Sequence, residues 1–216
     1  MTLVDCSVIL ADDHPFLLKG LAEYLKDLGY TVDGVAKNGL EAEKLLNIKQ
    51  SNIAILDIDM PGLTGLELAK IGAEKWQNTR FIILTYHKEQ EIVAQAKKFN
   101  ISGYILKEDA MLELNNCINC VLRGEFFLSA KIAHLDLNDA ESTLSALYGL
   151  TPSENKILKF IADGMSSEHI SNYLGISKRT VEKHRSNIVD KLQLTNHPFA
   201  LKEWAIENKK LIELSN

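Results

Sequence analysis

Five polar residues stand directly after apolar segments of strand length in the first half of the chain. They are Asp12 and Asp13, Asp57, Thr85 and Lys107. Stretches long enough to be crossover helices separate the apolar segments, so the segments fit a parallel sheet whose strand ends all emerge at one edge. Sites in open α/β sheets are built at that edge. We therefore expect three carboxylates, one hydroxyl group and one ammonium group to meet there.

The three carboxylates of Asp12, Asp13 and Asp57 predict a site for Mg²⁺. Carboxylates held close together resist ionisation unless a cation neutralises them, and hard oxygen ligands suit Mg²⁺, which keeps some waters and leaves room for a phosphate oxygen. A carboxylate beside bound Mg²⁺ can attack a phosphoryl donor and form an aspartyl phosphate. Asp57 stands alone at its strand end and is the candidate nucleophile, and Lys107 can pair with the new charge.

The composition is that of a soluble globular protein. The chain has 216 residues, of which 46% are hydrophobic and 25% charged, which allows one large or two small domains. No segment predicts a membrane span, and the N-terminal residues 1–6 lack the basic start of a signal peptide, so we expect a cytoplasmic protein. Cys117 and Cys120 lack the second cysteine pair or nearby histidine of a metal site, which favours free thiols.

The net charge of −5 is unevenly distributed along the chain. From residue 150 onward there are 10 Lys and Arg against 8 Asp and Glu, a net charge of +2. Residues 1–149 have 14 Lys and Arg against 21 Asp and Glu, a net charge of −7. This asymmetry predicts that the C-terminal part meets a polyanion.

The alternation of strand and helix patterns predicts an α/β fold for the first part of the chain. Five apolar segments alternate with helical stretches, at residues 7–11, 31–36, 53–56, 81–84 and 104–106. This order predicts a doubly wound five-stranded parallel sheet. Gly65, in the loop that follows Asp57, fits a segment that must stay close to the acidic residues.

The C-terminal part carries three helix signals in close succession. A capping box at Thr151 to Glu154 begins a helix that ends at Gly164. Ser166 or Ser167 caps a second, short helix, and a tight turn at residues 175–177 leads into a third helix that reaches about residue 192. A helix, a short glycine-containing turn and a basic helix are typical of a small all-α helix-turn-helix domain.

The periodicity of the third helix separates a core face from an outward face. Helical spacing directs Val181, Ile188 and Leu192 toward the core. The candidate DNA contacts are Lys178, Arg179, Thr180, Glu182, Lys183, Arg185, Ser186 and Asn187. Charge alone favours a solvated helix face, but an outward polar set after a glycine turn favours a surface that reads base edges and binds phosphates.

Residues 1–121 resemble the receiver domain of bacterial response regulators, because the acid pair, Asp57, Thr85 and Lys107 stand in this order at strand ends. The resemblance implies a flavodoxin-like fold and a phospho-acceptor role for Asp57. It also implies that Mg²⁺ is held by one residue of the acid pair, by Asp57 and by the backbone carbonyl of Asp59. It further implies that Thr85 and Tyr104 are the switch pair: the Thr85 hydroxyl turns toward the phosphoryl group, and the Tyr104 ring moves into the space that it vacates. The alternative for Tyr104 is a structural role, as an edge aromatic residue packed on the sheet.

Residues 150–192 resemble the LuxR-type helix-turn-helix. The matching residues are 161–164, 176–177, 180–181 and 184–188, and the departures are Ser153 and Ser167. We expect the linker at residues 122–149 and the DNA-binding domain at 150–216. The last helix, at 196–207, resembles the one that dimerises on DNA, so Phe199 and Trp204 either form a dimer interface or close the small core.

The two resemblances together predict a response regulator of the NarL/FixJ family. Its implied partners are a sensor histidine kinase, double-stranded DNA and, after phosphorylation, a second copy of the chain. Such a protein is no enzyme, although it takes part in its own phosphoryl transfer. One alternative is a haloacid-dehalogenase-like phosphatase, which has a D-x-D motif like Asp57 to Asp59 after a strand. Another is a regulator that works without phosphorylation.

One position departs from the receiver pattern. Tyr86 follows Thr85 at a place where a small or thin side chain is common. We expect the ring of Tyr86 to shield Asp57 and to alter the lifetime of the phosphoryl group or the access of phosphoryl donors.

Overall fold

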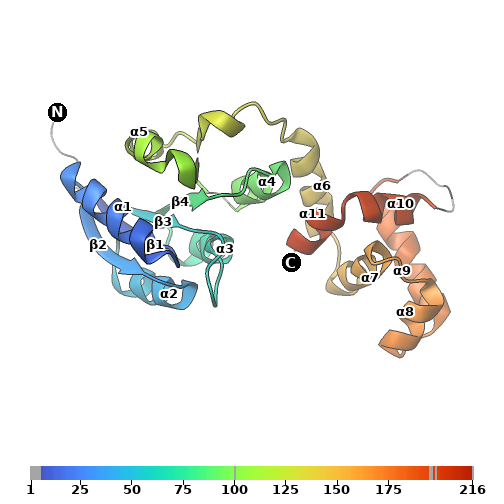
Figure 1. Cartoon of the computed structure of the whole chain (residues 1–216). Helices are drawn as coiled ribbons and strands as arrows, with labels where there is room; N and C mark the ends of the chain where they lie inside the picture. The colour runs from blue at the N-terminus through green and yellow to red at the C-terminus, as the bar shows by residue number, and fades with distance from the viewer. Residues whose placement is uncertain (1–5, 100, 195–196, 198, 216) are drawn as a thin grey trace. The chain divides into compact units, whose positions relative to one another are not determined.

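The computed structural model describes residues 6–99, 101–194, 197 and 199–215 (Figure 1). The chain divides into two compact units, Met1–Leu135 and Asp136–Asn216. The described residues contain no helix that is both long and apolar enough to span a membrane.

The first unit contains a parallel sheet with helices between its strands (Figure 1). The strands are β1 Ser7–Ala11, β2 Thr31–Ala36, β3 Ile53–Leu56, β4 Arg80–Thr85, β5 Gly103–Leu106 and β6 Phe127–Leu128, in the order β2-β1-β3-β4-β5-β6. The helices are α1 Pro15–Asp27, α2 Gly39–Ile48, α3 Gly65–Lys75, α4 Gln90–Lys98 and α5 Ala110–Leu122. The predicted doubly wound α/β fold is confirmed.

Burial explains why these segments form strands and helices. All four residues of β3 are buried, as expected for a central strand of a parallel sheet covered on both faces. Helix α1 buries Leu18, Leu21 and Leu25, which recur at helical spacing and pack into the main hydrophobic core. The core therefore fixes β1 and β3 side by side, with Ala11 in register with Leu56.

The sheet has a sixth strand that the sequence did not predict. Strand β6 lies within the expected linker and pairs with β5 in parallel, with Gly103 opposite Phe127 and Tyr104 opposite Leu128. A strand of two residues carries no detectable periodicity. Its place is set by backbone hydrogen bonds to β5, such as the one from the Ser129 N–H to the Tyr104 carbonyl at 2.9 Å.

The rest of the expected linker is also structured. The 3₁₀ turn η2, Ala130–Ile132, follows β6 in the first unit, and helix α6, Asn138–Tyr148, belongs to the second unit. Leu144 and Leu147 on α6 are buried, and α6 contacts the final helix α11, Lys209–Leu214.

The second unit contains the expected succession of helices. They are α7 Pro152–Ala162, α8 Ser167–Leu174, α9 Lys178–Lys191, α10 Ala200–Glu207 and α11. The capping box of Thr151 and Glu154 is present, and Ser166 rather than Ser167 caps α8, because its hydroxyl accepts the His169 N–H. Helix α8 ends at Gly175, whose φ of 66° is a left-handed conformation that glycine adopts without steric cost.

Candidate functional site

Three of the predicted strand-end residues, Asp12, Asp57 and Lys107, meet at the carboxyl edge of the sheet. Lys107 Nζ lies 2.8 Å from Asp12 Oδ2 and 2.8 Å from Asp57 Oδ2. The Lys107 side chain is 2% exposed and each of the two acidic side chains 3%. Strands β1, β3 and β5 thus deliver two carboxylates and their cation from three distant parts of the sequence to one buried place.

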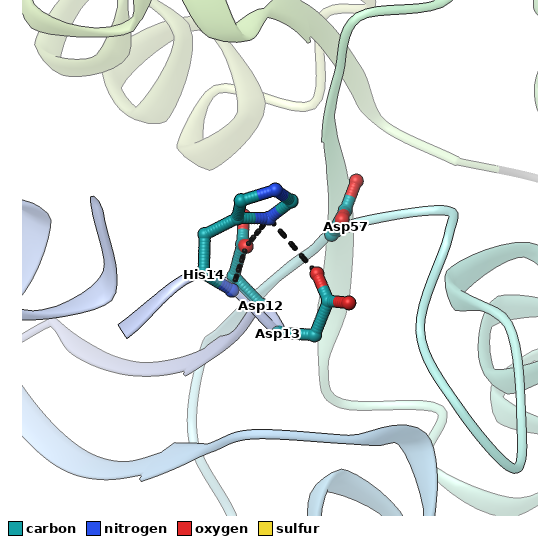
Figure 2. A group of neighbouring side chains, drawn as sticks. All are labelled: Asp12, Asp13, His14 and Asp57. Atoms are coloured by element: carbon teal, nitrogen blue, oxygen red, sulfur yellow. Dashed lines mark hydrogen bonds and ion pairs between the residues drawn. The ribbon is translucent and has the colours of Figure 1, made fainter. Parts of the chain in front are cut away.

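His14 also belongs to this cluster, which sequence reasoning missed. Its Nδ1 lies 2.9 Å from Asp12 Oδ1 and 2.9 Å from Asp13 Oδ1, and its backbone N–H donates to Asp12 Oδ1 (Figure 2). The imidazole is 59% exposed and so covers the acid pair from the solvent side. The sequence offered one signal for His14, its position directly after the acid pair Asp12-Asp13.

The cluster fits a hard divalent cation. One ligand atom from each of Asp12, Asp13, His14 and Asp57 lies within 4.8 Å of the others. Figure 2 shows these four side chains gathered at one place. Three of the four ligands are carboxylates, the donors that Mg²⁺ prefers. The buried Oδ2 atoms of Asp12 and Asp57 have Lys107 as their one partner among the described residues, so they retain capacity for a further cationic partner.

Burial and charge act in opposite directions on this cluster. Burial raises the pKa of Asp57, and Lys107 offsets part of that increase. Burial lowers the pKa of Lys107, but its contacts with Asp12 and Asp57 outweigh this effect and the pKa is raised overall. Lys107 is therefore a fixed ammonium group, and Asp57 is a poorly solvated carboxylate of the kind that can act as a nucleophile.

Gly65 keeps the loop after β3 against the site, as expected. A Cβ atom at this position would lie 2.2 Å from the carbonyl oxygen of Asp57, which is a severe overlap with backbone. The Gly65 N–H donates to the Ile58 carbonyl at 3.2 Å. Only glycine allows α3 to begin so close to the acidic strand end.

The predicted switch residues are both buried and both contact His87. The Thr85 hydroxyl accepts the backbone N–H of His87 at 3.3 Å, and the Tyr104 hydroxyl donates to the His87 carbonyl at 3.0 Å. Burial raises the pKa of Tyr104, so its hydroxyl stays protonated as a donor. Because β6 lies outside β5, Tyr104 is no edge residue.

The imidazole of His87 also binds the carboxylate of Asp59. His87 Nε2 lies 2.8 Å from Asp59 Oδ2, and His87 Nδ1 lies 3.2 Å from Glu89 Oε2. The Asp59 side chain is 71% exposed and turned toward His87. Its backbone carbonyl remains the predicted metal ligand. His87 was a second residue missed from the sequence, and its position two residues after Thr85 was the signal.

Tyr86 lies at the mouth of the site, where its ring centroid is 5.3 Å from Lys107 Nζ. This distance allows a cation–π contact. The ring is 63% exposed, so it forms part of the protein surface beside Lys107.

The second unit presents α9 as a polar helix. Val181 and Ile188 are fully buried, and Leu192, also expected in the core, is partly buried at the end of α9. Of the predicted DNA contacts, the exposed ones are Lys178, Arg179, Thr180, Glu182, Lys183 and Ser186. Arg185 and Asn187 are half-buried. The helix therefore separates a core face from a polar face as its periodicity predicts.

Two local contacts organise the exposed face of α9. Ser177 caps the helix by accepting the Thr180 N–H, and the Ser177 and Thr180 hydroxyl groups lie 2.8 Å apart. Thr180 therefore stabilises the start of the helix as well as facing solvent. Arg185 Nε lies 3.7 Å from Glu182 Oε2, so Glu182 orients the guanidinium group.

The expected dimer residues lie in different environments. Phe199, immediately before α10, is 64% exposed, whereas Trp204 within α10 is partly buried. The predicted start of this helix, at Asn196, lies outside the described residues.

Comparison with protein families identifies each of the two parts. Residues 8–119 match the response regulator receiver domain, and residues 149–202 match the bacterial regulatory proteins of the luxR family. A receiver sheet joined to a DNA-binding helix-turn-helix defines a transcriptional response regulator.

Relatives match this arrangement over nearly the whole chain. The oxygen regulatory protein NreC of Staphylococcus carnosus (strain TM300) is 31% identical over 215 residues, which cover 94% of this chain and 98% of NreC. The nitrate/nitrite response regulator protein NarL of Escherichia coli (strain K12) is 31% identical over 194 residues, covering 87% and 89%. A solved structure of two RcsB dimers bound to two parallel DNAs has a TM-score of 0.61 and 25% identity, covering 93% and 98%. The chain belongs to the NarL/FixJ family of response regulators.

Proposed function

We propose that Mg²⁺-dependent phosphorylation of Asp57 controls this regulator and that the phosphorylated protein binds double-stranded DNA as a homodimer. The observation that carries the proposal is the buried cluster in which Lys107 Nζ contacts both Asp12 and Asp57 at 2.8 Å. A sensor histidine kinase is the proposed phosphoryl donor. The protein acts in the cytoplasm, where its DNA target lies.

The residues of the cluster divide the chemistry between them. A carboxylate oxygen of Asp57 forms the new bond to phosphorus while the bond between phosphorus and the donor breaks, and the donor leaves with that electron pair. Asp12, Asp13, Asp57 and the Asp59 carbonyl are the proposed ligands of Mg²⁺, which supplies neutralisation of phosphoryl charge when bound. Lys107 is already positioned to pair with a phosphoryl oxygen.

The switch residues connect this chemistry to the surface. In the proposed mechanism the Thr85 hydroxyl turns toward the phosphoryl group and gives up its contact with the His87 N–H. Tyr104 is already buried, so its aromatic ring stays inside. The loop 86–89, whose His87 carbonyl accepts the Tyr104 hydroxyl, shifts around it. This remodels the surface around α4 and β5.

The exposed face of α9 is the proposed DNA-reading surface. Lys178, Arg179, Lys183 and Arg185 bind phosphates, and side chains such as Ser186 and Asn187 contact base edges in the major groove. Phe199 is the proposed dimer contact because it is exposed, and Trp204 contributes to the small core as well. A symmetric dimer requires a roughly symmetric operator.

The test is the intact mass of the full chain after incubation with a small phosphodonor, with and without Mg²⁺, while phosphate release is followed. We expect one Mg²⁺-dependent phosphoryl label that is lost slowly and is absent in Asp57→Asn. Asp59→Asn is the matched control, because it keeps the backbone carbonyl and should still be labelled. Rapid release of phosphate over many turnovers, abolished by both Asp57→Asn and Asp59→Asn, would instead favour the haloacid-dehalogenase-like phosphatase. DNA binding without any label would favour a regulator independent of phosphorylation.

A further inference from the structure

Glu108 is held by two lysines that come from different parts of the first unit. Its Oε1 lies 3.1 Å from Lys88 Nζ and 2.7 Å from Lys131 Nζ. Lys131 Nζ also lies 2.8 Å from Oδ1 of Asp109, whose side chain is 13% exposed. These contacts with Lys131 and Lys88 lower the pKa of Glu108, so the carboxylate stays charged. One oxygen atom of Glu108 therefore contacts both the loop after β4, through Lys88, and the segment after β6, through Lys131.

The first of these segments borders the phosphorylation site. Glu108 follows Lys107 directly, in the 3₁₀ turn η1, Lys107–Asp109, so a displacement of the Lys107 backbone displaces Glu108. Lys88 belongs to the loop 86–89 after Thr85 and is adjacent to His87, whose N–H bonds the Thr85 hydroxyl. One connection to Glu108 therefore begins at Lys107, which contacts Asp57, and the other begins at the loop that is hydrogen-bonded to Thr85.

The second segment, residues 127–132, consists of β6, Ser129 and η2. It is attached to the sheet by the Ser129 N–H, which donates to the Tyr104 carbonyl at 2.9 Å. It is also attached to α5, because the Ala130 N–H and the Ser129 hydroxyl both bond the carboxylate of Glu113. Ser129 and Ile132 are buried. The first unit ends at Leu135, three residues after this segment.

We propose that residues 127–132 report the state of Asp57 to the chain that enters the DNA-binding unit, and that Glu108 is the positioning residue that makes the connection. This inference rests on the proposed phosphorylation of Asp57. Two ammonium groups at one oxygen repel each other, so the departure of Lys88 with its loop strengthens the contact of Lys131 with Glu108. Phosphorylation therefore tightens the segment 127–132 on the sheet.

The test is hydrogen exchange of the backbone amides of residues 127–132 in the full chain, measured by mass spectrometry before and after labelling with a small phosphodonor and Mg²⁺. Lys131→Met should raise the exchange rate of the unlabelled protein about threefold, the size expected for partly exposed ion pairs. Lys88→Met should lower it by a similar factor. Lys49→Met is the matched control, because Lys49 is exposed and has no ion pair among the described residues.

Labelling should slow exchange of this segment in the wild type and in Lys49→Met, and should leave it unchanged in Lys131→Met, although Lys131→Met is labelled normally. If unlabelled Lys131→Met exchanges like Lys49→Met, the lysine does not hold the segment and the proposal is wrong. It is equally wrong if labelling slows exchange in Lys131→Met as in the wild type. Absence of any label in the wild type overturns the proposed function, and the unlabelled variants then still show whether Lys131 and Lys88 act on the segment.

Discussion

The contact between Glu154 and Lys191 should be a major source of stability in the DNA-binding unit. Glu154 lies in the first turn of α7 and Lys191 ends α9, and Lys191 Nζ lies 2.7 Å from Glu154 Oε2. The Glu154 side chain is 4% exposed, and its Oε2 also accepts the Thr151 N–H of the capping box. Burial raises the pKa of Glu154, but the contacts with Lys191 and Thr151 outweigh burial and lower it from 4.5 to about 2.

This pKa sets the expected magnitude and its pH dependence. A decrease of about 2.5 pKa units corresponds to at most about 3.4 kcal/mol, because one unit is about 1.4 kcal/mol. Lys191 is 40% exposed and screened by solvent, so we expect about 2 kcal/mol. The pKa of Glu154 is lower in the folded state, so the contribution is complete well above pH 4.5 and is lost as the pH falls toward about 2.

The assay is urea unfolding of Glu154→Gln, followed by Trp204 fluorescence in a Trp76→Phe background so that the second unit is observed alone. At pH 7 the variant should have a free energy of unfolding about 2 kcal/mol below that of the background protein, and the difference should fall by more than half by about pH 3. Glu207→Gln, which replaces an exposed glutamate, should change little.

Two results would refute this reasoning. One is a difference between Glu154→Gln and its background that stays constant from pH 7 to pH 3, since a charge that titrates cannot then be its source. The other is strict additivity of Glu154→Gln and Lys191→Met in a double-mutant cycle, because two residues that stabilise each other as an ion pair must show a coupling energy.

Three further predictions concern the two functional surfaces. Tyr86→Ala should speed formation or loss of the phosphoryl label severalfold, because the ring covers the site, while Tyr86→Phe leaves both rates unchanged. Equal rates in the wild type and both variants would show that Tyr86 has no part in the mechanism. Lys183→Ala should weaken DNA binding similarly across sequences and reduce the slope of log K against log salt concentration by about 1, unlike the control Lys156→Ala on α7. Gly65→Ala should reduce labelling at least tenfold, because a Cβ atom would lie 2.2 Å from the Asp57 carbonyl oxygen, and normal labelling would show that the loop can move aside.

In the proposed function, the residues that control access to Asp57 set how long the phosphoryl label lasts. The ring centroid of Tyr86 lies 5.3 Å from Lys107 Nζ, and the imidazole of His87, in the same loop, contacts the Asp59 carboxylate. Variants of these residues should therefore change the duration of the signal more than the fold, because their side chains are at least partly exposed.

The sequence by itself determined the sheet, the helix-turn-helix and most of the acidic cluster. An apolar strand followed by a polar residue is a local pattern, and parallel topology places every such strand end at the same edge. Asp12, Asp57 and Lys107 could therefore be grouped before any distance was known. The capping box at Thr151 and the glycine turn at Gly175 are equally local, because each satisfies backbone groups within a few residues.

Tertiary structure alone decided the contacts whose partners are distant in sequence or carry no periodic signal. Strand β6 is two residues long and exists because β5 offers it backbone hydrogen bonds. His87 became a central contact because the loop after β4 folds its carbonyl onto Tyr104 and its imidazole onto Asp59. The sharing of Glu108 by Lys88 and Lys131 likewise joins residues up to 43 positions apart. A single side chain of this kind has no pattern in the sequence, since its partner is fixed only when the sheet and its crossovers have closed.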